Sequence, residues 1–208
     1  MTLDKYEAII LDCDGVIFDS NNLKLNAFRN ILSNYNEDIV NKFIEYFKNN
    51  FGTSRYHLAK VFIEEFLKQE FNEELYQKIL DSYSKKCVLL YEKADITINF
   101  FEFIDKYKDK NLFVASGSAE DELRRMFEIR KLDNYFVEIF GSPTKKTEIV
   151  KNIVKENKNT VMIGDAKSDM LAAKENNIDF IFMSEYSTNE EMINDKNLCI
   201  VNNLGCLM

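Results

Sequence analysis

Two carboxylates follow the first apolar run of the chain, and their spacing suits metal and phosphate chemistry. The run Ile9-Ile10-Leu11 is followed by Asp12, Asp14 and Gly15. A short apolar run indicates a buried parallel strand, and glycine permits a sharp turn after it. Close carboxylates repel each other and lose solvation on burial, so a divalent cation would stabilise them, and oxygen ligands suit Mg²⁺. The alternative is a strand-end turn with two solvated Asp residues.

A second acidic cluster follows a later apolar run. Val161-Met162-Ile163 leads into Gly164-Asp165, and Asp169 follows one helical turn later. Because parallel strands share their carboxyl edge, and open α/β sheets bind ligands there, we expect the two clusters to form one site.

Two further segments carry groups that suit a phosphate. The apolar run 111–115 ends in Ser116-Gly117-Ser118, ahead of a helix predicted from Ala119 onward. Hydroxyl groups and free backbone N–H groups at such a point can cradle an anion. The pair Lys145-Lys146 precedes the Gly-Asp strand and offers a cation to a phosphoryl group.

These four motifs, in this order, resemble those of the haloacid dehalogenase superfamily over nearly the whole chain. The pair formed by the first and last motif is the specific part, whereas the serine and lysine motifs are weak alone. The dehalogenases of the superfamily lack the second acid of the first motif, so Asp14 indicates the phosphotransferase side. The relatives suggested are the phosphoglycolate phosphatases and the beta-phosphoglucomutases.

The resemblance implies roles for the acids. Asp12 is the expected nucleophile, which forms an aspartyl-phosphate. Asp14 is the expected general acid and later the base for water, with a pKa raised in part by its neighbour Asp12. Mg²⁺ is expected on the Asp12 carboxylate, the Asp14 backbone carbonyl and Asp165, while Asp169 orients the lysine or a metal-bound water.

The resemblance also implies how the phosphoryl group is held. Ser116 is expected to donate to its oxygens, with help from the Gly117 backbone. Either lysine of the pair fits the motif. Lys146 lies three residues before Ile149, which is a helix-start spacing, and we favour it over Lys145.

The pattern of the chain predicts an α/β fold, a Rossmann-like doubly wound parallel sheet with an inserted all-helical cap. The interval 18–93 shows helical periodicity only, so we assign residues 1–17 and 94–208 to the core and 18–93 to the cap. Hinges are expected near 18–20 and 92–94. The predicted strands are 6–12, 111–115, 137–141, 160–164, 178–183 and 198–201, and the predicted core helices are 97–109, 119–130, 146–157 and 167–176.

The cap carries one loop of interest. Residues 52–55, Gly-Thr-Ser-Arg, resemble the Gly-x-Ser-Arg loop of beta-phosphoglucomutase, which makes Arg55 a candidate ligand for an anionic group of the substrate. The alternative is a surface arginine paired with Glu64 or Glu65. Lys24 stands where the mutases have a histidine, which weakens a mutase interpretation; a Schiff-base role for this lysine is a further alternative.

Composition narrows the choice of partners. The chain has 208 residues and a net charge of −8, so nucleic acid and anionic membranes are not expected partners, and an anionic substrate needs local cations. No apolar segment reaches the length of a membrane span, and the four cysteines show no metal-binding spacing. We expect a cytoplasmic protein with reduced thiols.

Together these observations predict a Mg²⁺-dependent phosphatase of a small phosphorylated metabolite, a sugar or polyol phosphate, present as a monomer or homodimer. The first alternative is a phosphomutase. A receiver-type signalling domain also phosphorylates an aspartate, but the inserted segment 18–93 argues against it. A non-catalytic protein that binds phosphorylated metabolites is the remaining alternative.

Overall fold

A parallel sheet forms the centre of the core in the computed structural model, which describes residues 2–208. Its strand order is β5-β4-β1-β6-β7-β8, and every neighbouring pair is parallel. The strands are β1 (Ala8–Leu11), β4 (Asn111–Ala119), β5 (Glu138–Ser142), β6 (Thr160–Gly164), β7 (Asp179–Met183) and β8 (Cys199–Val201).

The central position of β1 explains its uninterrupted apolar sequence. All four of its residues are buried, because β4 and β6 flank it and both faces of the sheet are covered. Leu11, its last residue, lies level with Val114 of β4 and Ile163 of β6. The residues that follow these three strands therefore meet at one edge.

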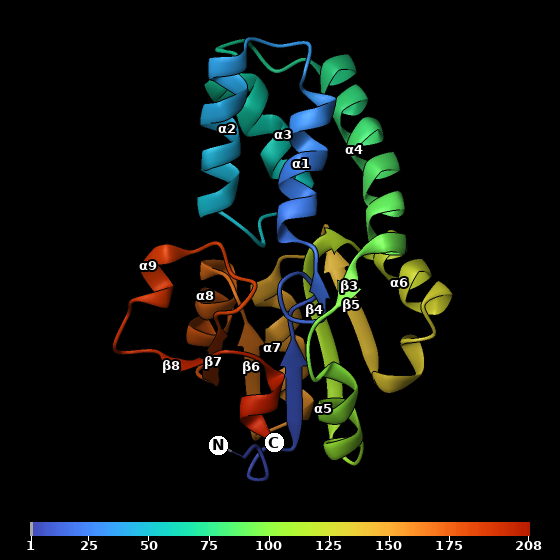
Figure 1. The fold of residues 1–208 in the computed structure, drawn as a ribbon, viewed down its shortest axis with the longest axis vertical. Helices are drawn as coiled ribbons and strands as arrows, with labels where there is room; N and C mark the ends of the chain where they lie inside the picture. Colours follow the sequence, from blue (N-terminus) through green and yellow to red (C-terminus); the bar gives the residue numbers. More distant parts are fainter. Residues whose placement is uncertain (1) are drawn as a thin grey trace.

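Helices cover the sheet on both faces (Figure 1). Ile9 and Leu11 pack in one apolar cluster with side chains of α5 (Phe100–Lys106) and α6 (Glu120–Ile129). Ala8 and Ile10 point the other way, into a second cluster with α7 (Lys146–Glu156) and α8 (Lys167–Glu175). The short α9 (Glu190–Ile193) lies near the carboxyl end of the chain.

The cap is a group of helices beyond the carboxyl edge of the sheet (Figure 1). The ring of Phe28 stacks on that of Tyr83 with 3.9 Å between centroids, and Phe43 and Phe47 pack edge-on around Phe28. These aromatic side chains give the cap its own core. Its elements are α1 (Asn21–Ile31), α2 (Glu37–Asn49), α3 (Arg55–Val61), the π-helix η1 (Phe62–Phe66) and α4 (Glu73–Lys93).

A two-stranded antiparallel ribbon joins cap and core. It pairs β2 (Phe18–Asp19) with β3 (Asp95–Ile96). The sequence did not predict these strands, because two residues are too few to show a periodic pattern. The predicted α/β sheet with a helical cap is confirmed. In the structure β2 starts at Phe18 and α4 ends at Lys93.

Most predicted bounds shift by one or two residues, but two elements differ by more. The helix predicted over 97–109 is the shorter α5 (Phe100–Lys106), and the other difference concerns the site. The strand predicted over 111–115 continues as β4 to Ala119, so Ser116-Gly117-Ser118 lies within a strand and α6 begins only at Glu120. The pairing of β4 with β5 shifts register between Ala115 and Ala119. The segment is therefore an irregular strand end rather than a turn before a helix.

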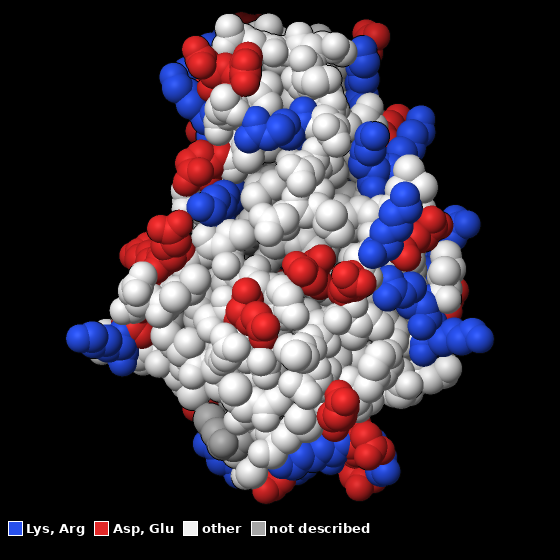
Figure 2. Space-filling model, in the orientation of Figure 1, with Lys and Arg blue, Asp and Glu red and all other residues white. Residues whose placement is uncertain are grey.

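The surface agrees with the expectation that attraction for an anion must be local. On the face shown in Figure 2, acidic side chains lie among the basic ones, and uncharged surface separates them. Lys24, Arg55 and Lys146 are buried and so contribute little to this surface. None of the helices within residues 2–208 is long and apolar enough to cross a membrane.

Candidate active site

Three carboxylates from two strand ends meet at the edge of the sheet. Asp12 follows β1, Asp165 follows β6, and Asp169 lies in the first turn of α8; one oxygen of each lies within 4.8 Å of the others. All three are buried. The sequence predicted this convergence from the shared edge of parallel strands.

Lys146, the first residue of α7, compensates part of this charge. Its Nζ donates to Asp12 Oδ1 at 2.9 Å and to Asp169 Oδ1 at 2.5 Å. Burial lowers the pKa of Lys146, but the charges of the two carboxylates raise it by more, so the ammonium persists. Lys145 is exposed and lines a neighbouring pocket of about 330 Å³ together with His57. The structure thus brings Lys146, and not Lys145, into contact with Asp12.

The cluster still holds more negative than positive charge. Burial, reinforced by the charge of Asp169, raises the pKa of Asp12 to about 7 although Lys146 opposes it. Burial and the charge of Asp12 also raise the pKa of Asp165 well above its usual range. Such shifts mark a site that a cation would stabilise.

The donor set fits Mg²⁺. Asp169 is fully engaged, because its second oxygen accepts from the Ala166 backbone N–H at 3.0 Å. Asp165 Oδ2 accepts from Asn21 Nδ2 at 2.6 Å, which leaves Asp165 Oδ1 and Asp12 Oδ2 outside these contacts. Hard oxygen ligands from two carboxylates suit Mg²⁺, which usually keeps several waters.

Gly15 permits the two motifs to approach. It has a φ of +78°, and a Cβ at this position would lie 2.2 Å from Asp165 Oδ2. A side chain here would displace Asp165 as well as strain the backbone.

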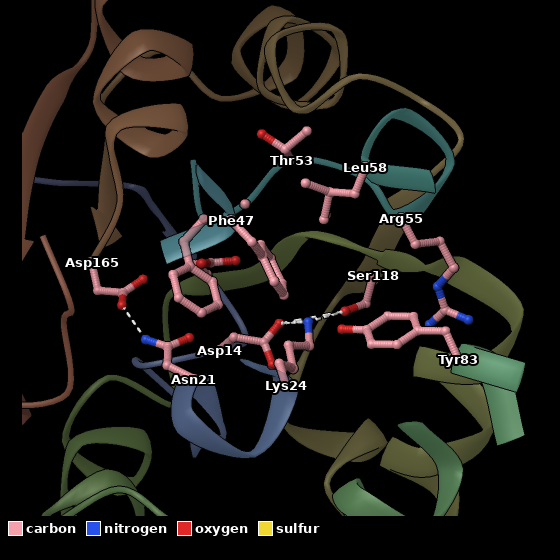
Figure 3. A pocket seen from close by; sticks show the side chains of 14 residues that line it. Asp14, Asn21, Lys24, Phe47, Thr53, Arg55, Leu58, Tyr83, Ser118 and Asp165 are labelled. Atoms are coloured by element: carbon pink, nitrogen blue, oxygen red, sulfur yellow. Dashed lines mark hydrogen bonds and ion pairs between the residues drawn. The ribbon is translucent and has the colours of Figure 1, made fainter. Parts of the chain in front are cut away.

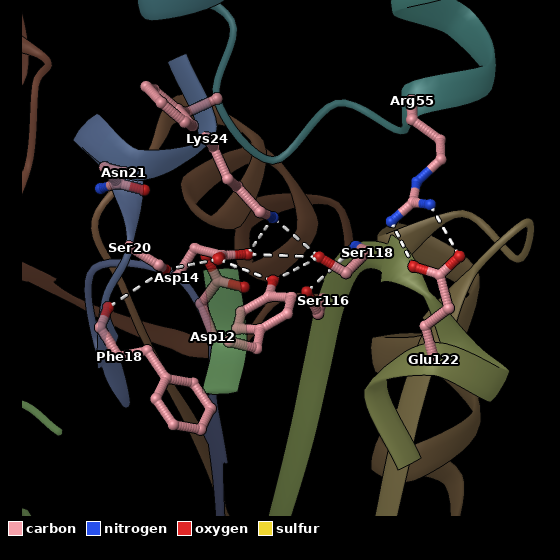
Figure 4. Close-up of polar contacts among 12 residues, drawn as sticks. Asp12, Asp14, Phe18, Ser20, Asn21, Lys24, Arg55, Ser116, Ser118 and Glu122 are labelled. Carbon is pink, nitrogen blue, oxygen red and sulfur yellow. Dashed lines mark hydrogen bonds and ion pairs between the residues drawn. The ribbon is translucent and has the colours of Figure 1, made fainter. Parts of the chain in front are cut away.

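Asp14 lies in a second polar network, in which the cap takes part (Figure 4). Its carboxylate forms an ion pair with Lys24 of α1 and accepts from Tyr91 of α4 at 2.8 Å. Ser20, at the junction with the cap, donates to it at 2.6 Å, and Ser118 of β4 at 3.4 Å. The same Lys24 ammonium donates to Ser118 Oγ at 2.7 Å.

The expected raised pKa of Asp14 is wrong. Burial does raise it, but the Lys24 ammonium and the hydrogen bonds from Ser20 and Tyr91 lower the pKa of Asp14 by more. Asp14 is therefore held as a carboxylate in this arrangement.

The serine segment meets the cap loop directly. A Cβ on Gly117 would lie 2.4 Å from the backbone oxygen of Gly52, and a Cβ on Gly52 would lie 1.9 Å from Ser168 Oγ. The two glycines thus let the cap loop rest on the core beside Lys146. Ser116 is buried, and its hydroxyl accepts from the backbone N–H of Ser118 at 3.1 Å.

Arg55 does not pair with Glu64 or Glu65, as the alternative from the sequence proposed. Its two terminal nitrogens form a forked contact with Glu122 of α6, at 2.9 and 2.8 Å. The guanidinium also lies over the ring of Tyr83 and is only 5% exposed. Arg55 therefore joins the cap to the core and is not a surface residue.

A small cavity separates cap and core over the acids (Figure 3). Its free volume is about 20 Å³, enough for one or two water molecules. Asp14, Lys24, Arg55 and Gly117 are among the residues that line it. A substrate group can occupy this cavity only if the cap moves away from the core, whereas Ser116, Gly117 and Lys146 also line the neighbouring pocket of about 330 Å³.

Sequence reasoning missed the partners of Asp14 and Arg55. Lys24, Tyr91, Asn21 and Glu122 contact site residues from the cap or from α6. Of these, the sequence drew attention only to Lys24, at the position of the mutase histidine, and not as a partner of Asp14. Tyr91 lies 77 residues from Asp14. One signal was present: Lys24 follows Ser20 by four residues, which places both on one face of a helix start, next to the expected hinge.

Comparison with known proteins agrees with this geometry. Residues 9–183 match the profile of the haloacid dehalogenase-like hydrolases. A soluble P-type ATPase-like phosphatase of Methanocaldococcus jannaschii is 24% identical over 103 residues, which are 49% of this chain but only 38% of that protein.

Solved structures share the fold. A predicted phosphoglycolate phosphatase from Haemophilus somnus is 13% identical, with a TM-score of 0.74 over 97% of this chain and 96% of that chain. The hydrolase YfnB from Bacillus subtilis, solved bound to magnesium, is 15% identical, with a TM-score of 0.63 over 86% and 89% of the two chains. Because the profile spans both acidic motifs, the serine segment and Lys146, this chain belongs to the haloacid dehalogenase-like hydrolases.

Proposed function

We propose that this protein is a Mg²⁺-dependent phosphatase that hydrolyses a small phosphorylated metabolite, a sugar or polyol phosphate, through an aspartyl-phosphate on Asp12. The observation that carries the proposal is the buried group of Asp12, Asp165 and Asp169 around Lys146. The magnesium-bound relative and the phosphatase named among the relatives support it.

The metal site would comprise Asp12, Asp165 and the backbone carbonyl of Asp14, with Asp169 holding Lys146 beside them. Bound Mg²⁺ would supply positive charge to the phosphoryl oxygens and keep Asp12 ionised.

The remaining chemistry belongs to the chain. The Asp12 carboxylate attacks phosphorus, and the bond to the alcohol oxygen breaks. Lys146, Ser116 and the Gly117 backbone N–H would hold the phosphoryl oxygens as charge develops on them. Asp14 would give the leaving oxygen a proton, which it would take up from water while the cap is open and Lys24 and Tyr91 are away from it.

The second step returns the enzyme to its starting state. Water attacks the phosphorus of the aspartyl-phosphate while Asp14 takes its proton, and phosphate leaves. Lys24 and Tyr91 hold Asp14 in the ionised form that this step requires.

Release of inorganic phosphate tests the proposal. The protein is incubated with Mg²⁺ and a panel of sugar, polyol and aryl phosphates, and acid-quenched samples are examined for a phosphorylated peptide that contains Asp12. We expect phosphate release and a labelled peptide, both absent in Asp12→Asn. Transfer of the phosphoryl group between sugar hydroxyls with little free phosphate would indicate the phosphomutase alternative instead.

A further inference from the structure

We propose that the alcohol part of the substrate is uncharged and carries hydroxyl groups, and that the site discriminates against monoesters bearing a second carboxylate or phosphate. This inference rests on the proposed phosphatase function. It is drawn from how the cations and the unpartnered polar atoms of the cavity are arranged.

Both cations that line the cavity already have a carboxylate partner. Lys24 is paired with Asp14 and donates to Ser118 Oγ (Figure 3). Arg55 uses both terminal nitrogens on Glu122 (Figure 4). Each cation is therefore already neutralised by a carboxylate, so a second anionic group would meet no uncompensated positive charge.

The two ion pairs depend on cap closure. Lys24 and Arg55 belong to the cap, whereas Asp14 and Glu122 belong to the core. Each pair forms again whenever the cap returns to the core. If the cap closed over a second anionic group of the substrate, that group would lie beside Asp14 or Glu122. It would lose its hydration and gain no cation to compensate for the loss.

Two buried polar atoms in the same wall lack a partner among residues 2–208. They are Asn21 Oδ1, an acceptor, and Arg55 Nε, a donor. The orientation of the Asn21 amide is fixed, because its Nδ2 donates to Asp165 Oδ2 at 2.6 Å and to the Tyr186 backbone oxygen at 3.0 Å. A carboxylate cannot donate to Asn21 Oδ1, whereas one hydroxyl group can donate there and another can accept from Arg55 Nε.

The rest of the cavity wall is apolar and can contact the carbon atoms of a substrate. Phe47, Leu58 and the ring of Tyr83 line the cavity between these polar atoms (Figure 3). Apolar walls with a few placed polar groups are typical of sites for small neutral ligands.

Matched substrate pairs test the inference in the wild-type protein. One pair is 2-hydroxyethyl phosphate and phosphoglycolate, and the other is 4-(hydroxymethyl)phenyl phosphate and 4-carboxyphenyl phosphate; each differs only by a hydroxymethyl group in place of a carboxylate. We expect kcat/KM to favour the neutral member by at least about tenfold. Equal or faster hydrolysis of the carboxylates overturns the inference but leaves the phosphatase function intact.

A charge variant tests the source of the discrimination. In Glu122→Gln the amide oxygen can still accept a hydrogen bond from Arg55, but no carboxylate neutralises the guanidinium. Its charge can then attract a carboxylate of the substrate, so we expect the preference for the neutral member to fall by at least about fivefold. Glu128→Gln removes the same charge from an exposed position of α6 and serves as the matched control.

An unchanged preference in a folded Glu122→Gln overturns the inference. If that variant does not fold, the ratios of kcat/KM for the two substrate pairs in the wild-type protein decide whether the inference holds. Failure of the wild-type protein to release phosphate from the neutral members as well contradicts the proposed function itself, which is a separate outcome.

Discussion

Asp12 and Asp14 are two residues apart, yet different regions of the molecule hold them. The neighbours of Asp12 are Lys146, Asp165 and Asp169, all from strand ends and helix starts of the core. Asp14 is held instead by side chains that come largely from the cap. The two halves of one site therefore depend on the position of the cap to different degrees.

This difference separates binding of the phosphoryl group from proton transfer. The Asp12 half consists of core residues, apart from the contact of Asn21 with Asp165, so most of it persists when the cap is away from the core. The Asp14 half gains Lys24 and Tyr91 only when the cap is closed. Since the closed cavity of about 20 Å³ has no room for a substrate group, we expect the cap to open and close during turnover.

The largest effect is expected from Asp12→Asn, which removes the proposed nucleophile from the core half. We expect kcat to fall at least about 10³-fold, because an amide cannot form the phosphoryl intermediate. The thermal midpoint should stay unchanged or rise, because a buried, poorly compensated charge is removed. Phosphate release and thermal melting measure the two quantities. Activity within tenfold of the wild type would exclude Asp12 as the nucleophile.

Removal of the metal comes next and also acts on the core half. We expect a chelator to abolish phosphate release and Mg²⁺ to restore it, because Asp12 and Asp165 would otherwise repel each other. Mg²⁺ at about 100 times its Kd should also stabilise the fold by about 2.7 kcal/mol, seen as a higher melting temperature. The Asp12→Asn variant should gain less. Full activity in excess chelator would remove the metal from the mechanism.

Lys24→Met acts on the cap half and should have an intermediate effect. Losing the ammonium lets burial raise the pKa of Asp14, so the group is protonated over a wider pH range. The attack of water on the intermediate needs ionised Asp14, so the acidic limb of the pH profile for kcat should move to higher pH, with kcat lower by about 10²-fold.

Lys42→Met, at an exposed position of the cap, is the control for this shift. An unmoved acidic limb in Lys24→Met would show that Lys24 does not set the ionisation of Asp14. Both variants are assayed at a temperature where melting curves show them folded.

The smallest effect on turnover is expected from Arg55→Ala. Glu122 is 24% exposed and so loses its partner at moderate cost, about 1–3 kcal/mol of stability. Because Arg55 joins the cap to the core, kcat/KM should fall on neutral sugar phosphates and on aryl phosphates alike. It should fall further on the sugar phosphates, whose hydroxyl groups would also lose the Arg55 Nε donor. Equal losses would show that Arg55 only supports the contact between cap and core.

The acidic core of the site was predictable because it depends on local order and one topological rule. Alternation of apolar runs and helical segments indicated the parallel sheet, and parallel strands bring their carboxyl ends together. Asp12, Asp165 and Asp169 therefore met as expected, and the spacing to Ile149 chose Lys146 over Lys145.

Only the tertiary structure decided what surrounds Asp14 and Arg55. Their partners depend on how the cap rests on the core, and contacts such as Tyr91 with Asp14 join positions that no local pattern relates. The ionised state of Asp14 and the ion pair between Arg55 and Glu122 follow from that packing. Local sequence fixes which residues end each strand, but the pairing of distant side chains across a hinge follows from the packing of two separate cores.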